Sequence, residues 1–126
     1  MGNLAGLSVL VLEDEFLIAL DAEQILRGLG AAAVEIASTF ERAQELAAEG
    51  RFDLAVLDVN INGQLSFPIA KVFEQRGVPV VFASGYELRA RPPVGFEGGI
   101  YVTKPYTTER LREAVSSALS KRTTPQ

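Results

Sequence analysis

Five short apolar runs, separated by segments of helical periodicity, constrain the fold of this chain more than any other feature. Each run is rich in Val, Leu, Ile or Ala, and the runs cover 7–12, 34–37, 54–57, 78–83 and 100–103. Short apolar runs of this kind are typical of strands in a parallel sheet that is covered on both faces. Their alternation with helical segments predicts an α/β, doubly wound fold.

The segments between the runs predict four helices and one exception. Apolar residues recur at helical spacing over 16–29, 40–49 and 67–76, and again from Thr107 or Thr108 to about 120. Ser38 with Glu41 predicts a capping box for the second helix, and Ser66 is expected to cap the third. Between Ser84 and Gly99 the chain has two prolines and four glycines. This composition predicts a loop in place of a helix, with at most one turn around 87–90.

Length and composition exclude several classes of protein. The 126 residues suit a single domain, which we expect to have its core over 7–120 and a frayed tail over 121–126. The chain has no cysteine, which excludes disulfides and thiolate metal sites, and no histidine, which excludes a phosphohistidine carrier. Its net charge of −4 is scattered, which argues against a nucleic-acid binder. No run is long enough to cross a membrane and no signal peptide is evident, so we expect a cytoplasmic protein.

Five polar side chains stand where the predicted strands end. Glu13 and Asp14 follow the first run, Asp58 the third, Ser84 the fourth and Lys104 the fifth. Because ligands bind outside the carboxyl ends of parallel strands, these groups are expected to converge on one site. Carboxylates suit Mg²⁺, and a carboxylate held by a metal and a lysine can accept a phosphoryl group. Each motif alone has an ordinary explanation as a turn, a helix start or a strand exit, but together at matching strand ends they favour a site.

These residues resemble the receiver domains of two-component response regulators. The resemblance covers about 7–120 and rests on the acidic pair Glu13-Asp14, on Asp58 in LAVLDVN, on Ser84 in FASG and on Lys104-Pro105. It implies a flavodoxin-like sheet of five parallel strands in the order 2-1-3-4-5, with the fourth helix shortened or replaced by a loop. It also implies that 1–126 is a single, stand-alone receiver domain.

The same resemblance implies the roles of the site residues. Asp58 would be the phosphoacceptor, and Mg²⁺ would be held by Glu13 or Asp14, by Asp58 and by the backbone carbonyl of Asn60. Ser84 and Lys104 would bind the phosphoryl group, with Tyr101 turning inward as Ser84 moves. The bond before Pro105 is usually cis in relatives and would help to fix the lysine.

A finer resemblance is to the alphaproteobacterial receivers with a Phe-Ala-Thr-Gly-x-Tyr-type motif. Here VVFASGY has Ser84 in place of Thr and no residue between Gly85 and Tyr86. The usual Met-Pro after the phosphoacceptor is replaced by Ile61-Asn62-Gly63, which should reshape the turn. In relatives, the positions of Asn60 and Tyr86 tune hydrolysis of the acyl phosphate.

The resemblance predicts a phosphorelay protein that acts through protein binding. Its phosphodonor would be a sensor histidine kinase of the HWE or a related class, or a histidine phosphotransferase, and its output would pass to an unknown downstream protein. We expect a monomer or weak dimer, with no nucleic acid and no membrane as partner. A phosphate sink and a phosphorylation-independent adaptor stay as alternatives. An aspartate-based phosphatase is disfavoured because Asn60 stands where a general acid is needed, so catalysis would be limited to the chain's own aspartate.

Overall fold

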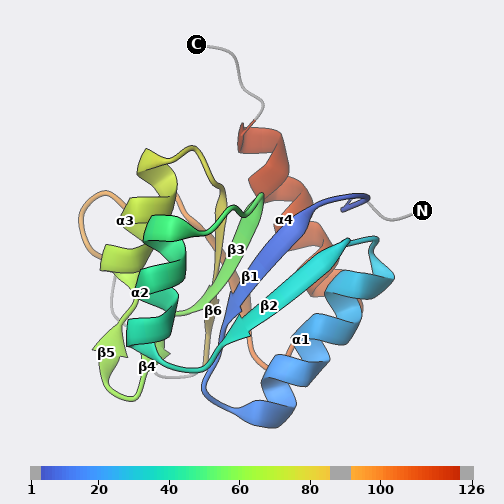
Figure 1. Ribbon diagram of the computed structural model, residues 1–126, viewed down its shortest axis with the longest axis horizontal. Helices are drawn as coiled ribbons and strands as arrows, with labels where there is room; N and C mark the ends of the chain where they lie inside the picture. Colours follow the sequence, from blue (N-terminus) through green and yellow to red (C-terminus); the bar gives the residue numbers. More distant parts are fainter. Residues whose placement is uncertain (1–3, 86–91, 123–126) are drawn as a thin grey trace.

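A computed structural model describes residues 4–85 and 92–122 of the chain (Figure 1). Its strands and helices alternate along most of the sequence, as the apolar runs predict. In chain order the elements are β1 (Ser8–Leu12), α1 (Phe16–Gly28), β2 (Ala33–Ala37), α2 (Phe40–Glu49), β3 (Leu54–Asp58), β4 (Asn60–Ile61), β5 (Gln64–Leu65), α3 (Phe67–Gln75), β6 (Val80–Ser84), β7 (Ile100–Thr103) and α4 (Thr108–Arg122).

The five long strands form one parallel sheet in the order β2-β1-β3-β6-β7. This is the predicted order 2-1-3-4-5, which is therefore confirmed. Every residue of β3 and β6 is buried, as expected for central strands that are covered on both faces. The carboxyl ends of these strands meet at the same edge of the sheet, which is the edge where the predicted site residues lie.

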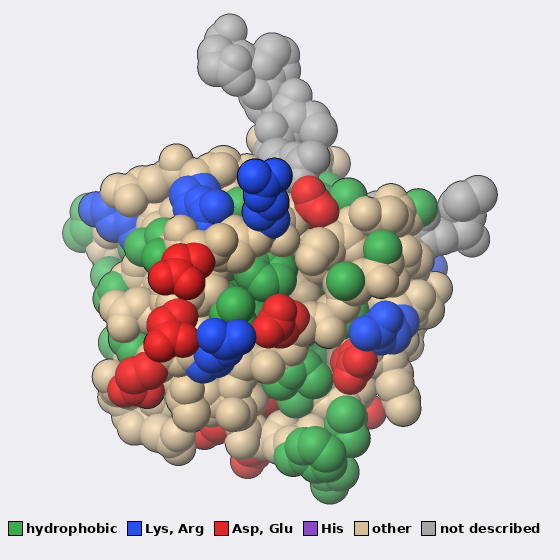
Figure 2. Space-filling view, viewed as in Figure 1, with side chains coloured by type: hydrophobic (Ala, Val, Ile, Leu, Met, Phe, Trp, Pro, Cys, Tyr) green, Lys and Arg blue, Asp and Glu red, His purple; other side chains and the backbone are tan. Residues whose placement is uncertain are grey.

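Two layers of helices cover the sheet, with α1 and α4 on one face and α2 and α3 on the other (Figure 1). The outer surface carries acidic and basic side chains interspersed with one another on the face in Figure 2. Within the part of the chain that the structure describes, no helix is long and apolar enough to cross a membrane.

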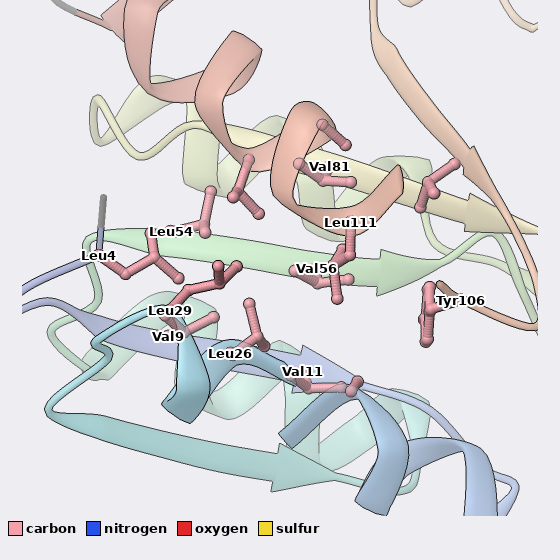
Figure 3. Packing of buried hydrophobic residues seen from close by; sticks show 14 of the residues in the cluster. Leu4, Val9, Val11, Leu26, Leu29, Leu54, Val56, Val81, Tyr106 and Leu111 are labelled. Atoms are coloured by element: carbon pink, nitrogen blue, oxygen red, sulfur yellow. The ribbon is translucent and has the colours of Figure 1, made fainter. Parts of the chain in front are cut away.

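Alternating strand residues divide the core into two clusters. Val9, Val11 and Val56 point toward α1 and α4, where they meet Leu26 and Leu111 (Figure 3). On the other face the largest buried side chains are Leu10, Leu12, Leu57, Ile61, Ile69, Phe73 and Phe82. The two clusters pack against opposite faces of the sheet and hold its strands, and so the strand ends at the site, in place.

The core begins earlier than the predicted boundary at residue 7. Leu4 is completely buried, and its backbone N–H donates a hydrogen bond to the carbonyl of Leu29. At the other end, α4 continues to Arg122 and so includes the first two residues of the expected tail. The remaining four residues of the tail lie outside the described part of the chain.

Two local predictions fail for identifiable reasons. The N-cap of α2 is Thr39, not Ser38: the Thr39 hydroxyl accepts a hydrogen bond from the N–H of Arg42. The strand β6 begins at residue 80, not 78. The N–H of Val78 donates to the carbonyl of Phe73 and so belongs to the end of α3, while Pro79 has no N–H to give to a sheet. Ser66 is the N-cap residue of α3 but makes no capping bond with its side chain.

The segment between β6 and β7 lacks helix in its described parts, residue 85 and residues 92–99. Two hydrogen-bonded turns shape it, from Phe96 N–H to the Pro93 carbonyl and from Gly99 N–H to the Phe96 carbonyl. The expected turn at 87–90 lies outside the described residues. The described loop agrees with a fourth helix that is shortened or replaced.

Candidate functional site

Three acidic side chains meet at the carboxyl edge of the sheet. Glu13 and Asp14 follow β1, and Asp58 is the last residue of β3, the strand beside β1. One carboxylate oxygen from each lies within 4.8 Å of the others. Glu13 and Asp58 are each only 1% exposed, whereas Asp14 is half-buried. The convergence predicted from the strand ends is therefore present.

Lys104 occupies the middle of this cluster. Its ammonium Nζ lies 2.8 Å from Oδ2 of Asp58 and 3.2 Å from Oε1 of Glu13. The Lys104 backbone N–H donates to the carbonyl of Ser84, which ties the exit of β7 to the end of β6. The bond between Lys104 and Pro105 is cis, as the resemblance implied. One lysine thus reaches across three strand ends to compensate two buried acids.

Burial dominates the electrostatics of the acids. It raises the pKa of Glu13 to about 7, and the negative charge of Asp58 adds to this effect, while a hydrogen bond from the Glu15 N–H and the nearby Lys104 oppose it. Burial also raises the pKa of Asp58, although its hydrogen bond with Lys104 works in the opposite direction. Two buried carboxylates with one lysine between them are short of positive charge.

The cluster fits a hard divalent cation. Mg²⁺ prefers oxygen ligands and keeps several waters, and here three carboxylates offer oxygens from one side while Asp14 stays partly open to solvent. Burial by itself lowers the pKa of Lys104, but its hydrogen bond to Asp58 and the charges of both acids raise it overall. Lys104 therefore stays charged.

Ser84 and Tyr101 lie on the neighbouring strands. Ser84 ends β6, is 8% exposed and pairs in register with Thr103, whereas Asp58 pairs with the preceding residue of β6. Tyr101 is half-buried on β7, and its ring stacks on Phe82 with ring centres 5.0 Å apart. Its hydroxyl donates a hydrogen bond to the carbonyl of Phe96 at 3.0 Å. In this structure Tyr101 therefore holds the described end of the irregular connection, residues 92–99.

The remaining predicted residues are placed as follows. Asn60 opens a short hairpin, and its N–H donates to Oδ1 of Asp58 at 3.3 Å while its own side-chain oxygen accepts from the N–H of Gly63. Its backbone carbonyl as a metal ligand stays a prediction. Tyr86 lies outside the described residues. Tyr106 is not among the predicted site residues, yet it is buried with a hydroxyl that has no partner in the described chain, and the charges of Glu13 and Asp58 act on it. Its place directly after Lys104-Pro105 was the available signal.

The architecture and the acid–lysine cluster agree with a match to a known family. The family described as response regulator receiver domain matches residues 9–116, most of the chain. The chain belongs to the response regulator receiver domain family. Membership of this family makes the chain a signalling domain.

Three relatives of this receiver domain illustrate the similarity. The solution structure of SdrG from Sphingomonas melonis is 32% identical, with a TM-score of 0.79, and the match covers 94% of this chain and 99% of that one. The receiver domain of the PhyR response regulator from Erythrobacter litoralis is 29% identical, with a TM-score of 0.79, over 99% and 98% of the two chains. The phyllosphere-induced regulator PhyR of Methylorubrum extorquens is 29% identical over 88% of this chain and 43% of that protein.

Overall, the chain spans about half the length of the curated relatives it matches. SdrG and PhyR are alphaproteobacterial receivers, which agrees with the expected resemblance to that group. The finer assignment through the motif around Phe82–Tyr86 stays a prediction.

Proposed function

We propose that this receiver domain accepts a phosphoryl group on Asp58 and uses it to switch the binding of another protein. The observation that carries the proposal is the Lys104 ammonium, which lies 2.8 Å from Asp58 inside a cluster of three converging carboxylates. A structural ion pair would need one acid, whereas this arrangement keeps surplus negative charge buried at the end of the sheet. A divalent cation among the carboxylates would balance this surplus, and with Lys104 it would let the site accept an anionic phosphoryl group.

The chemistry divides among the chain's own residues. An oxygen of the Asp58 carboxylate attacks phosphorus, the bond from phosphorus to the donor nitrogen breaks, and the electron pair leaves with the donor. Lys104 moves from the carboxylate to a phosphoryl oxygen and balances its charge, and the Ser84 hydroxyl donates to a second oxygen. Glu13, Asp14 and Asp58, with the carbonyl of Asn60, would hold Mg²⁺, which supplies further charge neutralisation to the transferring group.

The phosphodonor would be a histidine kinase of the HWE or a related class, or a histidine phosphotransferase, in a bacterial cytoplasm. Two exposed apolar residues support a protein donor. Phe16 and Leu17 are 72% and 76% exposed at the start of α1, directly after the acidic loop. Figure 2 shows apolar side chains protruding at the lower edge of the molecule, where the start of α1 lies in Figure 1. Apolar side chains next to a reactive carboxylate offer a docking rim that a small phosphate ester would not need.

The output would pass through Tyr101 and the face formed by β7 and α4. Movement of Ser84 toward a phosphoryl group opens space beside Phe82, into which the Tyr101 ring could turn. That rotation would break the hydrogen bond from Tyr101 to the Phe96 carbonyl and so remove one contact between β7 and residues 92–99. Tyr101→Ala should then leave phosphorylation intact and weaken binding of the downstream partner.

The deciding experiment is phosphorylation by acetyl phosphate with and without Mg²⁺, followed by intact mass for the native chain and for Asp58→Asn. Addition of one phosphoryl group that requires both Mg²⁺ and Asp58 would support the proposal. Absence of this product, together with absence of beryllofluoride binding, would exclude phosphorylation at this site and favour the phosphorylation-independent adaptor.

A further inference from the structure

Tyr106 is a buried residue that carries a polar hydroxyl group into the core. Its side chain is 7% exposed and packs in the cluster between the sheet and the helices α1 and α4. The hydroxyl is buried and has no hydrogen-bond partner within the described chain. A phenylalanine would fill the same space without burying an unsatisfied hydroxyl, which costs free energy. We therefore expect the tyrosine hydroxyl to find a hydrogen-bond partner in another state of the site.

The position of Tyr106 indicates where that partner is. Tyr106 follows Lys104 by two residues, and Figure 3 shows it beyond Val56 at the carboxyl end of β3, the strand that ends at Asp58. Burial raises the pKa of Tyr106, and the negative charges of Glu13 and Asp58 raise it further, so both acids act on the hydroxyl through space. The unused donor therefore lies at the carboxyl edge of the sheet, which also carries the acidic cluster.

Glu13 is the acid that loses a donor when the site is used. Its Oε2 accepts from the Glu15 N–H, and its Oε1 accepts from Lys104. Once Lys104 turns to a phosphoryl oxygen, Oε1 of this buried carboxylate is left without the lysine. A buried carboxylate needs hydrogen bonds to stay charged and correctly placed for a cation.

We propose that Tyr106 is a positioning residue, whose hydroxyl donates to the Glu13 carboxylate when Lys104 moves to the phosphoryl group on Asp58. This inference rests on the proposed function for the movement of Lys104. The Tyr106 hydroxyl would then have a hydrogen bond in the phosphorylated state, whereas it has none within the described chain in the present structure.

The first test measures the affinity of the Mg²⁺–beryllofluoride complex by isothermal titration calorimetry for the native chain, Tyr106→Phe and Ser66→Ala. Ser66 is a matched control because its hydroxyl is also buried without a partner in the described chain. Loss of a hydrogen bond to a charged group predicts about tenfold weaker binding for Tyr106→Phe. Ser66→Ala should bind as the native chain does, and equal binding by Tyr106→Phe would overturn the assignment.

The second test is independent of phosphorylation. In a double-mutant cycle without Mg²⁺ at pH 8, Lys104→Met removes the lysine from Glu13 permanently. Tyr106→Phe alone should not lower the unfolding temperature, whereas in the Lys104→Met background it should lower it by about 4 °C. Equal effects in both backgrounds would overturn the role of Tyr106. If the native chain neither accepts a phosphoryl group nor binds beryllofluoride, the proposed function fails, and this cycle still decides the role of Tyr106.

Discussion

The raised pKa of Glu13 makes a quantitative prediction about stability against pH. In the unfolded chain Glu13 should lose its proton near its ordinary pKa of 4.5, whereas in the folded chain it keeps the proton until about 7. The folded state thus binds more protons between these two values, so this group's contribution to stability is complete below pH 4.5 and is lost as pH rises to 7. At about 1.4 kcal/mol for each pH unit, the loss amounts to roughly 3 kcal/mol.

Replacement of Glu13 by Gln removes this titration, so comparison with the native chain gives the part of the pH-dependent stability that is due to Glu13. The pKa of Asp58 is also raised, so the native chain loses stability from both acids over this range, and the variant keeps only the part due to Asp58. The assay is urea unfolding at pH 5, 6, 7 and 8 in the presence of EDTA. The free energy of unfolding of the native chain should fall by roughly 3 kcal/mol more than that of Glu13→Gln between pH 5 and 8.

The result has a second readout in Mg²⁺. Because a proton and the cation compete for the Glu13 carboxylate, Mg²⁺ should raise the stability of the native chain more at pH 8 than at pH 6. Glu13→Gln should show a smaller gain at pH 8. Parallel pH profiles for the two proteins would refute the reasoning, because they would mean that Glu13 has the same proton affinity folded and unfolded.

Three further predictions concern the fold, and urea unfolding checks each. Thr39→Ala should lower the free energy of unfolding by about 1 kcal/mol because α2 loses its cap, whereas Ser38→Ala should change it little; the reverse ranking would contradict the observed cap. Phe73→Ala should cost about 3–5 kcal/mol because the ring is completely buried, and a loss below 1 kcal/mol would show that the cluster collapses around the gap. Gly63→Ala should cost about 1 kcal/mol because Gly63 has φ of +88°, and an unchanged stability would mean that the hairpin turn can adopt another shape.

The sheet and the acidic cluster could be predicted because they depend on strand ends. An apolar run needs only its approximate limits to fix which polar residue follows it, so Asp58 and Lys104 were expected together without any knowledge of side-chain conformations. The error of two residues at the start of β6 does not affect the predicted site, because the site depends on the carboxyl end of the strand, where Ser84 lies as predicted.

The details that could not be predicted depend on competition between neighbours. Ser38 and Thr39 are both good caps, and the choice between them is decided by where the backbone of β2 ends. The burial of Leu4 and the unpartnered hydroxyl of Tyr106 depend on tertiary packing, which no local pattern records. The hairpin of β4 and β5 is different, because the sequence does carry a signal for it. Asn62-Gly63 is a known hairpin pair, although only a reshaped turn is predicted there from the sequence.

That hairpin changes what Asn60 can do at the site. Asn62 and Gly63 both have positive φ, of 52° and 88°, and the turn is closed by the bond from the Gly63 N–H to the side-chain oxygen of Asn60. The side-chain oxygen is thus engaged away from the carboxylate, while the Asn60 N–H stays on Asp58. Any influence of Asn60 on the lifetime of an acyl phosphate would therefore act through its backbone or its amide nitrogen. Ile61-Asn62-Gly63, in place of Met-Pro, thus sets Asn60 in a hydrogen-bonded turn that begins two residues after Asp58.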